Sequence, residues 1–230
     1  MSWKFGILCA GDSELEPFLG HIQNCVVTEK AMLKFYEGKI NGVSITALYS
    51  GVGKVNAAVA AQILIDTYHV DAVINAGTAG GIHGKIKIFD SVISTQVAYH
   101  DMDDDILTEF HPWLASVYFD ADEKLLNKAK DVFKDRNSVF FGKMVTGDKF
   151  IEDKMRTIID EKYSPLSVDM ETASIAHVCC VNKIPFIAIR TITDTASHDG
   201  ADSFERNCEQ ASVISKNITL EFLKEFNDRS

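Results

Sequence analysis

The fold class of this chain is decided by the apolar run Ile184-Pro185-Phe186-Ile187-Ala188-Ile189-Arg190-Thr191-Ile192-Thr193-Asp194. The run is rich in β-branched residues and ends in a carboxylate. The stretch Val168-Asp169-Met170-Glu171-Thr172 repeats this arrangement earlier in the chain. Ligands collect at the carboxyl ends of strands in open α/β sheets, so we expect the acids that follow these two strands to face one cleft.

A third acid follows the first expected strand, Phe5 to Ala10. Glu14 stands at the start of an amphipathic stretch just after that strand, a place equivalent to the two described above. Three carboxylates with Arg190 beside them suit chemistry through a cationic transition state, with separate acid and base roles. Any one of these three carboxylates, taken alone, could instead be a solvated side chain in a loop, because most Asp and Glu side chains are exposed. The equivalent placement of all three favours a site.

Composition indicates a soluble globular protein. The chain has 230 residues, of which 46% are hydrophobic and 24% charged, and no linker, repeat or low-complexity segment divides it. We therefore expect a single domain over residues 1–230. The formal net charge of −10 argues against nucleic-acid binding, which depends on patches of Lys and Arg. Small molecules are the expected partners.

The expected compartment is the cytoplasm. Met1-Ser2-Trp3-Lys4 leads into the first strand without the pattern of a signal peptide, and no apolar run is long enough to span a bilayer, so no membrane association is expected. The five cysteines are odd in number and form no Cys-x-x-Cys pair, which indicates neither a disulfide framework nor a zinc site. Cys179 and Cys180 are expected to fill the core, as is His177 in its apolar helix.

The residue patterns predict alternating strands and helices. Asn41-Gly42 is a strong hairpin turn signal between strands at 35–40 and 43–50. Further strands are expected at 5–10, 70–76, 91–98, 138–146, 167–169 and 186–192. Helices are expected at 55–68, 122–133, between 151 and 167, at 171–181 and at 204–226. This alternation predicts a mixed or parallel sheet covered by helices on both faces.

Two glycine-rich turns follow strands but match no nucleotide motif. The turn that begins Gly51-Val52-Gly53-Lys54 has Asn56 where the dinucleotide-binding motif Gly-x-Gly-x-x-Gly requires its third glycine. Neither this turn nor 77–81 has the Gly-Lys-Ser/Thr sequence of a P-loop. We expect these glycines to let backbone amides approach a neutral ligand or a water. The acidic run from His100 to Asp105 could ligate a divalent cation, but it lacks the EF-hand spacing, and a solvated loop or a subunit contact is favoured.

Taken together, these motifs resemble bacterial 5′-methylthioadenosine/S-adenosylhomocysteine nucleosidases, nearly end to end and in order. The segments that carry the resemblance are 5–14, 50–57, 75–81, 99–101, 146–151, 168–172, 176–179 and 190–194. These nucleosidases belong to the purine nucleoside phosphorylase superfamily. The resemblance implies a three-layer α/β/α sandwich around a mixed, twisted β-sheet and a reaction that needs no cofactor and no metal. The substrates it implies are adenine nucleosides, whose N-glycosidic bond is hydrolysed to adenine and a 5-thioribose.

The resemblance also implies roles for individual residues. Asp194 matches the general acid that protonates adenine N7, and Glu14 matches the residue that activates the attacking water. Glu171 matches the residue that binds the ribose hydroxyls, where its charge would favour an oxocarbenium-like sugar. Arg190 and Thr78 stand where the family helps to hold the water.

Further residues match the family's substrate-binding positions. Phe150 is expected to stack on adenine, and the backbone of Ile151 to read its edge. Met170 is expected under the ribose, and Phe204, from a mobile segment, at the 5′ side. The remaining substrate-binding positions are Val52, Asp169 and Thr193.

The family's 5′ pocket borrows a loop from a second subunit, which implies a homodimer in which residues 102–113 of the partner complete the site. Apolar residues that we expect on the surface of this loop, such as Phe110, Trp113 and Leu114, favour the same conclusion, because a monomer rarely exposes so large an apolar patch. In this loop, Asp104 and Leu107 fall about where apolar and aromatic residues are common.

The chain departs from the family pattern at several positions. Gly11 replaces a bulky apolar residue of the 5′-thioalkyl pocket, and Asp169 replaces a usual Glu. Thr193 keeps the hydroxyl of a usual Ser. These departures leave the preferred 5′ substituent open.

Two alternative functions stay open. A nucleoside phosphorylase needs cationic side chains for phosphate, but this chain has Asn75 where such enzymes typically carry an Arg. A non-catalytic nucleoside-binding module could dispense with Asp194 and Glu14, and this chain has both.

Overall fold

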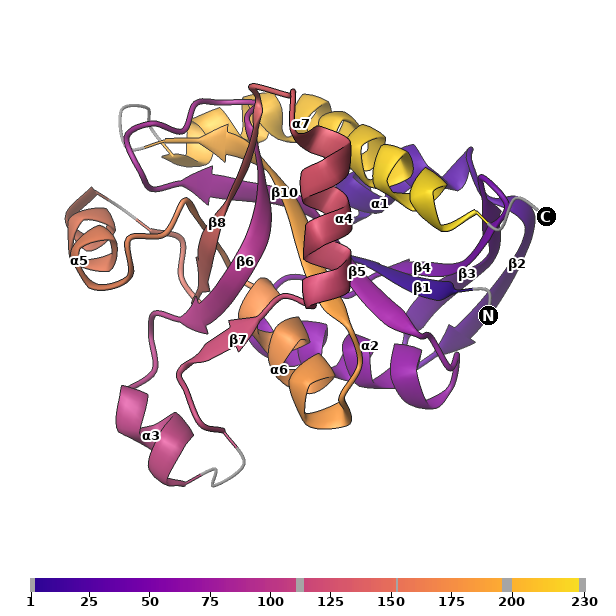
Figure 1. The fold of residues 1–230 in the computed structure, drawn as a ribbon, viewed down its shortest axis with the longest axis horizontal. Coiled ribbons are helices and arrows are strands. Elements are labelled where there is room, and N and C mark those ends of the chain that lie inside the picture. The colour runs from indigo at the N-terminus through magenta and orange to yellow at the C-terminus, as the bar shows by residue number, and fades with distance from the viewer. Residues whose placement is uncertain (1–2, 111–113, 152, 196–199, 228–230) are drawn as a thin grey trace.

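The computed structural model describes residues 3–110, 114–151, 153–195 and 200–227. These residues form one large sheet with helices on both sides (Figure 1). The strands are β1 (Lys4–Cys9), β2 (Gln23–Lys30), β3 (Leu33–Ile40), β4 (Val43–Tyr49), β5 (Ala72–Gly81), β6 (Ser91–Tyr99), β7 (Tyr118–Asp120), β8 (Val139–Thr146), β9 (Ser167–Asp169) and β10 (Phe186–Asp194). The helices are α1 (Asp12–Leu19), α2 (Lys54–Asp66), α3 (Asp104–Glu109), α4 (Glu123–Phe133), α5 (Asp153–Tyr163), α6 (Thr172–Asn182) and α7 (Gly200–Leu223), followed by a short 3₁₀ turn, Lys224–Phe226.

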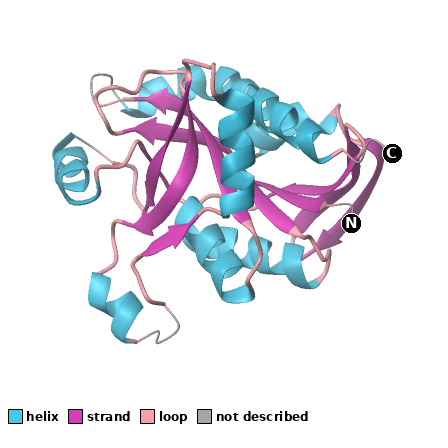
Figure 2. Cartoon of the chain, in the orientation of Figure 1, coloured by secondary structure: helices cyan, strands magenta, loops and turns pink. Residues whose placement is uncertain are grey.

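The helices sort into two layers, one on each face of the sheet (Figure 2). Helices α1, α4 and α7 cover one face, where Phe18, Phe133 and Phe222 join a single buried cluster. Helices α2 and α6 cover the other face, with α3 projecting below them and α5 standing at the edge beside β8 (Figure 1). The expected three-layer α/β/α architecture is therefore confirmed. No helix in the described ranges is both long and apolar enough to cross a membrane.

The sheet closes on itself at one end. Strand β10 pairs in parallel with β5 and antiparallel with β6, and β6 continues through β8 and β9 back to β5. These five strands form a closed ring, and β1, β4, β3 and β2 extend from β5 as an open sheet. Closure removes the free edges of the five strands, and it points several strand ends toward one opening.

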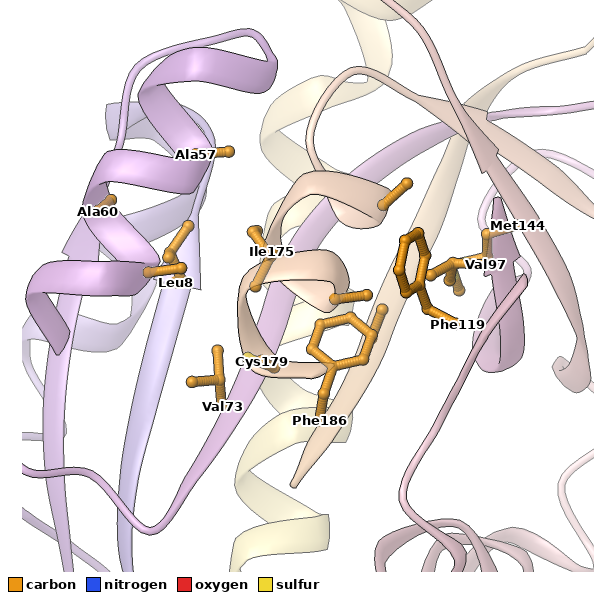
Figure 3. Close-up of a cluster of buried hydrophobic side chains, with 14 of the residues drawn as sticks. Leu8, Ala57, Ala60, Val73, Val97, Phe119, Met144, Ile175, Cys179 and Phe186 are labelled. Atoms are coloured by element: carbon orange, nitrogen blue, oxygen red, sulfur yellow. The ribbon is translucent and has the colours of Figure 1, made fainter. Parts of the chain in front are cut away.

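The core between the sheet and the α2/α6 layer combines aliphatic side chains with alanines and aromatic rings (Figure 3). Ala57 and Ala60 of α2 let that helix lie close to the sheet, where it packs over Leu8 and beside Ile175 of α6. Phe119 and Phe186 fill the space beyond α6. Helix α6 is apolar nearly all round, as expected for a helix with neighbours on most sides.

The described structure confirms most expected elements and adds three. The hairpin at Asn41-Gly42 joins β3 to β4 as predicted, with both turn residues at positive φ. Strand β2, helix α3 and strand β7 were not expected. Strand β2 was missed because all of its residues are exposed, so it lacks the alternation of a half-buried strand.

Two local expectations are wrong. The stretch 77–81 is not a turn, because β5 runs unbroken to Gly81, pairing with β10 as far as Gly80 and with β9 at Gly80 and Gly81. The glycines there make room for neighbouring side chains instead. Cys180 is exposed on the outer side of α6, although Cys179 is buried as expected.

Candidate active site

One cavity of about 260 Å³ opens where β1, β5, β9 and β10 end. Its wall carries eleven of the twelve residues that the sequence singles out, and the twelfth, Arg190, lies directly behind three of them. The predicted residues on the wall are Glu14, Val52, Thr78, Phe150, Ile151, Asp169, Met170, Glu171, Thr193, Asp194 and Phe204. The acids that follow separate strands therefore do face one cleft, as the sequence predicts.

Glu14 is held in place by four donors. Its Oε2 atom accepts the backbone N–H groups of Ala10 (2.7 Å) and Gly11 (3.2 Å), closing the first turn of α1 on itself. Its Oε1 atom accepts the backbone N–H and the hydroxyl of Thr78, at 2.6 and 2.8 Å. The carboxylate thus joins the start of α1 to the middle of β5 and has one fixed orientation.

Arg190 is fully buried among three carboxylates, and we call these four residues the Arg190 cluster: Arg190, Glu14, Asp169 and Glu171. Its Nη2 atom lies 2.8 Å from Oε2 of Glu171 and 3.0 Å from Oδ2 of Asp169. Its Nη1 atom lies 3.7 Å from Oε1 of Glu14 and has no hydrogen-bond partner within the described residues. This buried donor therefore lies beside the Glu14 carboxylate within ion-pair distance but without a hydrogen bond.

Two carboxylates of the Arg190 cluster, Glu171 and Asp169, differ in their pKa values. Burial raises the pKa of Glu171 to about 7; Arg190 and the Gly53 N–H at 2.9 Å oppose that rise, and Asp169 adds to it. Burial acts on Asp169 as well, but Arg190 and the hydroxyls of Thr146 and Thr172 outweigh it and lower the pKa of this carboxyl. The three carboxylates outweigh burial in the same way and raise the pKa of Arg190. Asp169 is therefore a fixed anion, whereas Glu171 titrates near neutral pH.

Asp194 lines the same cavity and follows a bulge in β10. The register with β5 shifts between Ile192 and Asp194, so Thr193 is an extra residue, and such bulges re-aim the side chain that follows. The Thr193 hydroxyl lies 2.9 Å from Oδ1 of Asp194, and Nη2 of Arg156 lies 2.5 Å from Oδ2. Both members of the Arg156–Asp194 ion pair are almost completely buried.

The rest of the wall is largely apolar. Phe150, Val52 and Phe204 are partly exposed at the mouth of the cavity, and Met170 and Ile151 lie deeper. A side chain at Gly11 would meet only the hydroxyl of Ser13, at 3.7 Å from its Cβ atom. The wall beside Gly11 is therefore wide, as the missing bulky residue leads us to expect.

Four wall residues with polar or charged side chains were not predicted from the sequence: Ser13, Lys149, Arg156 and Cys208. Ser13 and Cys208 contact each other from α1 and α7, with Oγ and Sγ 3.6 Å apart. Lys149 stands beside Phe150 and could have been included with it. Arg156 gave no signal, because one arginine in a charged, amphipathic helix looks like an ordinary surface residue.

In the loop expected from a partner subunit, the described residues 102–110 do not line the cavity of their own chain. Asp104 forms an ion pair with Lys162 of α5 at 3.0 Å. Phe110 is exposed, but Leu107 and Leu114 are buried within the chain, so the apolar patch is smaller than expected. Trp113 lies outside the described residues.

Other motifs serve structural roles. The Nδ2 atom of Asn75 donates to the Leu8 carbonyl, and its Oδ1 atom accepts the Thr172 hydroxyl, so Asn75 ties β1 and α6 to β5. In the acidic run, both carboxylate oxygens of Asp101 bind Lys54 at 2.9 Å. His177 stacks on Phe119, with ring centroids 4.8 Å apart, and is only partly buried.

Comparisons with known proteins agree with this geometry. The model of the phosphorylase superfamily matches residues 4–224. A 5′-methylthioadenosine/S-adenosylhomocysteine nucleosidase from an Exiguobacterium species is 36% identical, and the match covers 96% of this chain and 97% of the relative.

Solved structures give the same result. The nucleosidase of the same name from Colwellia psychrerythraea, in complex with adenine, matches with a TM-score of 0.88 and 32% identity over 98% of this chain and 96% of that one. The futalosine hydrolase of Helicobacter pylori matches with a TM-score of 0.89 and 26% identity over 98% and 99% of the two chains. The chain therefore belongs to the 5′-methylthioadenosine/S-adenosylhomocysteine nucleosidase family of the phosphorylase superfamily.

Proposed function

We propose that this protein hydrolyses the N-glycosidic bond of 5′-methylthioadenosine and S-adenosylhomocysteine, releasing adenine and a 5-thioribose product. The observation that carries the proposal is that Asp194 lines the same cavity as Glu14 and Glu171, two carboxylates of the Arg190 cluster. A proton donor for the leaving base and a negatively charged site for the sugar then belong to one cavity. The named relatives support the choice of substrates.

Asp194 acts as the general acid. Adenine is a poor leaving group until N7 is protonated, and Asp194 lies near Ile151, because Arg156 contacts both Asp194 and the Ile151 carbonyl oxygen. Phe150 stacks on the purine ring, and the backbone of Ile151 pairs with its edge. Thr193 supports the acid through its hydroxyl.

The Arg190 cluster acts on the sugar and the water. Glu171, with Met170 beside it, binds the ribose hydroxyls, and the anionic surroundings stabilise the oxocarbenium-like transition state. Glu14 takes a proton from the attacking water. The Nη1 atom of Arg190, which has no hydrogen-bond partner among the described residues, and the Thr78 hydroxyl orient this water. Val52 and Phe204 border the site at its mouth.

The charge of the site disfavours phosphorolysis. The buried cations Arg156 and Arg190 are both engaged by carboxylates. Each guanidinium group already forms ion pairs with carboxylates, so neither offers the uncompensated positive charge that binds phosphate. A passive binding module is disfavoured because Glu14 is held by four donors in a position suited to a base.

The deciding experiment measures adenine release in phosphate-free buffer, with both thioethers, adenosine, inosine and futalosine as substrates. A free 5-thioribose product supports hydrolysis. Strict dependence on added phosphate, with a ribose 1-phosphate product, refutes it. Futalosine is included because a solved neighbour is named for that activity.

The acid is tested with Asp194→Asn, which keeps the shape of the side chain but cannot deliver the proton. We expect kcat to fall by about 10²- to 10⁴-fold, with nucleoside binding retained. A variant with wild-type kcat would mean that another group is the acid.

We further propose a homodimer in which residues 102–113 of the partner complete the 5′ side. Exposed Ile106 and Phe110 on and after α3, together with Val55, Val59 and Val181 on α2 and α6, make an apolar surface on the side of the molecule from which α3 projects (Figure 1). Light scattering across the working concentration range tests this proposal, and a fully active monomer contradicts it.

The cytoplasmic location stays a prediction, which cell fractionation tests. It is supported by five cysteines without a disulfide, at Cys9, Cys25, Cys179, Cys180 and Cys208.

A further inference from the structure

Arg156 is a buried, ionisable side chain of the cavity wall. It has no role in the reaction described above. It comes from α5 and reaches three acceptors on three separate segments. Its Nη2 atom lies 2.5 Å from Oδ2 of Asp194, Nη1 lies 2.5 Å from the Gly81 carbonyl oxygen, and Nε lies 3.3 Å from the Ile151 carbonyl oxygen. These acceptors belong to the end of β10, the end of β5 and the loop expected to read the base.

We infer that Arg156 is the positioning residue of the general acid: it fixes the carboxyl group of Asp194 so that Oδ1 alone carries the proton to the base. The inference rests on the proposed function, because it assigns a role within that reaction.

The choice of Oδ1 follows from the donors around the carboxyl group. A guanidinium group has only N–H donors, so the oxygen that it contacts must act as an acceptor. Oδ2 of Asp194 is that oxygen, and the proton of the neutral carboxyl is then placed on Oδ1.

The Thr193 hydroxyl changes its hydrogen-bond acceptor when Oδ1 of Asp194 loses its proton. Its hydroxyl lies 2.9 Å from Oδ1 of Asp194 and 3.3 Å from the Ala79 carbonyl oxygen, and it has one proton to donate. With Oδ1 protonated, Thr193 donates to Ala79. When the O–H bond of Oδ1 breaks and an N–H bond forms at N7, Thr193 turns to the new carboxylate, which Arg156 already contacts.

A purely structural role explains the ion pair less well. Replacing a buried ion pair by apolar residues is often neutral or stabilising, so stability alone is a weak reason to keep one at the wall of a site. Helix α5 also has an apolar anchor of its own, since Ile159 and Tyr163 are buried against Val145 and Val168. This anchor holds α5 in place when Arg156 is substituted, while the loss of one member of the buried ion pair is expected to lower the melting temperature.

The test compares Arg156→Gln and Arg156→Lys with wild type and with Arg136→Gln. Arg136 is a matched control because it forms an exposed ion pair with Glu221 far from the cavity. We expect Arg156→Gln to lower kcat for 5′-methylthioadenosine by about 10- to 100-fold, because a misplaced catalytic group loses rate on this scale. A lysine at this position can keep the contact with Oδ2 of Asp194 but cannot contact all three acceptors at once. Arg156→Lys should therefore recover part of the kcat that Arg156→Gln loses.

Two further measurements separate positioning from structure. The 7-deaza analogue of 5′-methylthioadenosine has a C–H group in place of N7, so Arg156→Gln should change its Kd by less than about threefold. In an Asp194→Asn background, Arg156→Gln should cost less than about threefold in kcat, because its effect acts through the acid.

The inference is overturned if Arg156→Gln weakens binding of the deaza analogue by the same factor as it lowers kcat for the substrate. It is equally overturned if the effects of Arg156→Gln and Asp194→Asn on kcat multiply in the double variant. It is also overturned if Arg156→Gln turns over at the wild-type rate. Failure of the proposed function is a different result, because wild type itself would then release no adenine in phosphate-free buffer. A melting temperature for each variant identifies any that fail to fold, and Arg156→Lys then carries the same comparisons.

Discussion

Gly77 is the position where the smallest change should disturb the active site most. A Cβ atom at Gly77 would lie 2.5 Å from the carboxyl carbon of Glu14 and 2.6 Å from Nη1 of Arg190. Neither neighbour is the free end of an exposed side chain, because both belong to the buried Arg190 cluster. Gly77→Ala must therefore displace Glu14, Arg190 or β5 itself.

The size of the effect follows from the contacts of Glu14. An ordinary contact needs about 3.4 Å or more, so the carboxylate must move by about 1 Å. That shift breaks the hydrogen bonds from the Thr78 N–H and hydroxyl, which are 2.6 and 2.8 Å long. Hydrogen bonds to charged groups contribute about 1.5 to 3 kcal/mol each, so about 3 to 6 kcal/mol of support for this orientation is at stake. A misplacement of 1 Å can lower kcat/KM by about 10²-fold.

The assay is the initial rate of adenine release by Gly77→Ala, with Gly84→Ala as the control. A Cβ atom at Gly84 meets nothing within 4 Å, so the control should keep wild-type activity and stability. Thermal unfolding checks that the Gly77 variant is folded. If Gly77→Ala keeps kcat/KM within threefold of wild type, the fixed geometry around Glu14 is not what the reaction needs.

Two further predictions concern pH and selectivity. Burial raises the pKa of Glu171 to about 7, and a carboxyl whose pKa rises on folding stabilises the fold below its unfolded pKa and loses that contribution as pH rises through 7. Unfolding by denaturant should therefore show Glu171→Gln gaining on the order of 2 to 3 kcal/mol relative to wild type between pH 4 and 8, and a constant difference would contradict this. Gly11→Met should fill the wide wall beside Ser13 and raise kcat/KM for 5′-methylthioadenosine relative to S-adenosylhomocysteine, by about 10-fold for roughly 1.4 kcal/mol of added apolar contact. An unchanged ratio would show that this wall does not meet the 5′ group.

The elements that the sequence predicts well are those with strong local signals. The apolar run before Asp194, the Asn41-Gly42 turn and the alanine-rich helix α2 each follow from residue type and spacing within a short window. The acids of the site were found for the same reason, because each one follows a recognisable strand.

The features that were missed depend on contacts between distant residues. The reach of Arg156 to Asp194 depends on where α5 packs, which its own sequence does not indicate. The bulge at Thr193 is set by the pairing of β5 with β10, and the continuation of β5 through Gly81 by its pairing with β10 and β9. The exposure of Cys180 depends on which side of an apolar helix meets solvent, and α6 has no amphipathic pattern to tell.

The closed ring of strands has a consequence for how the chain folds. Strand β10 closes the ring by placing Ile187 opposite Ile74 and Ile189 opposite Ile93, pairings between residues roughly a hundred positions apart. Contacts of such high sequence separation form slowly, so β5 and β6 have unpaired edges until β10 arrives. The segment that completes the catalytic pocket is thus also the one that protects the folding chain from edge-to-edge aggregation.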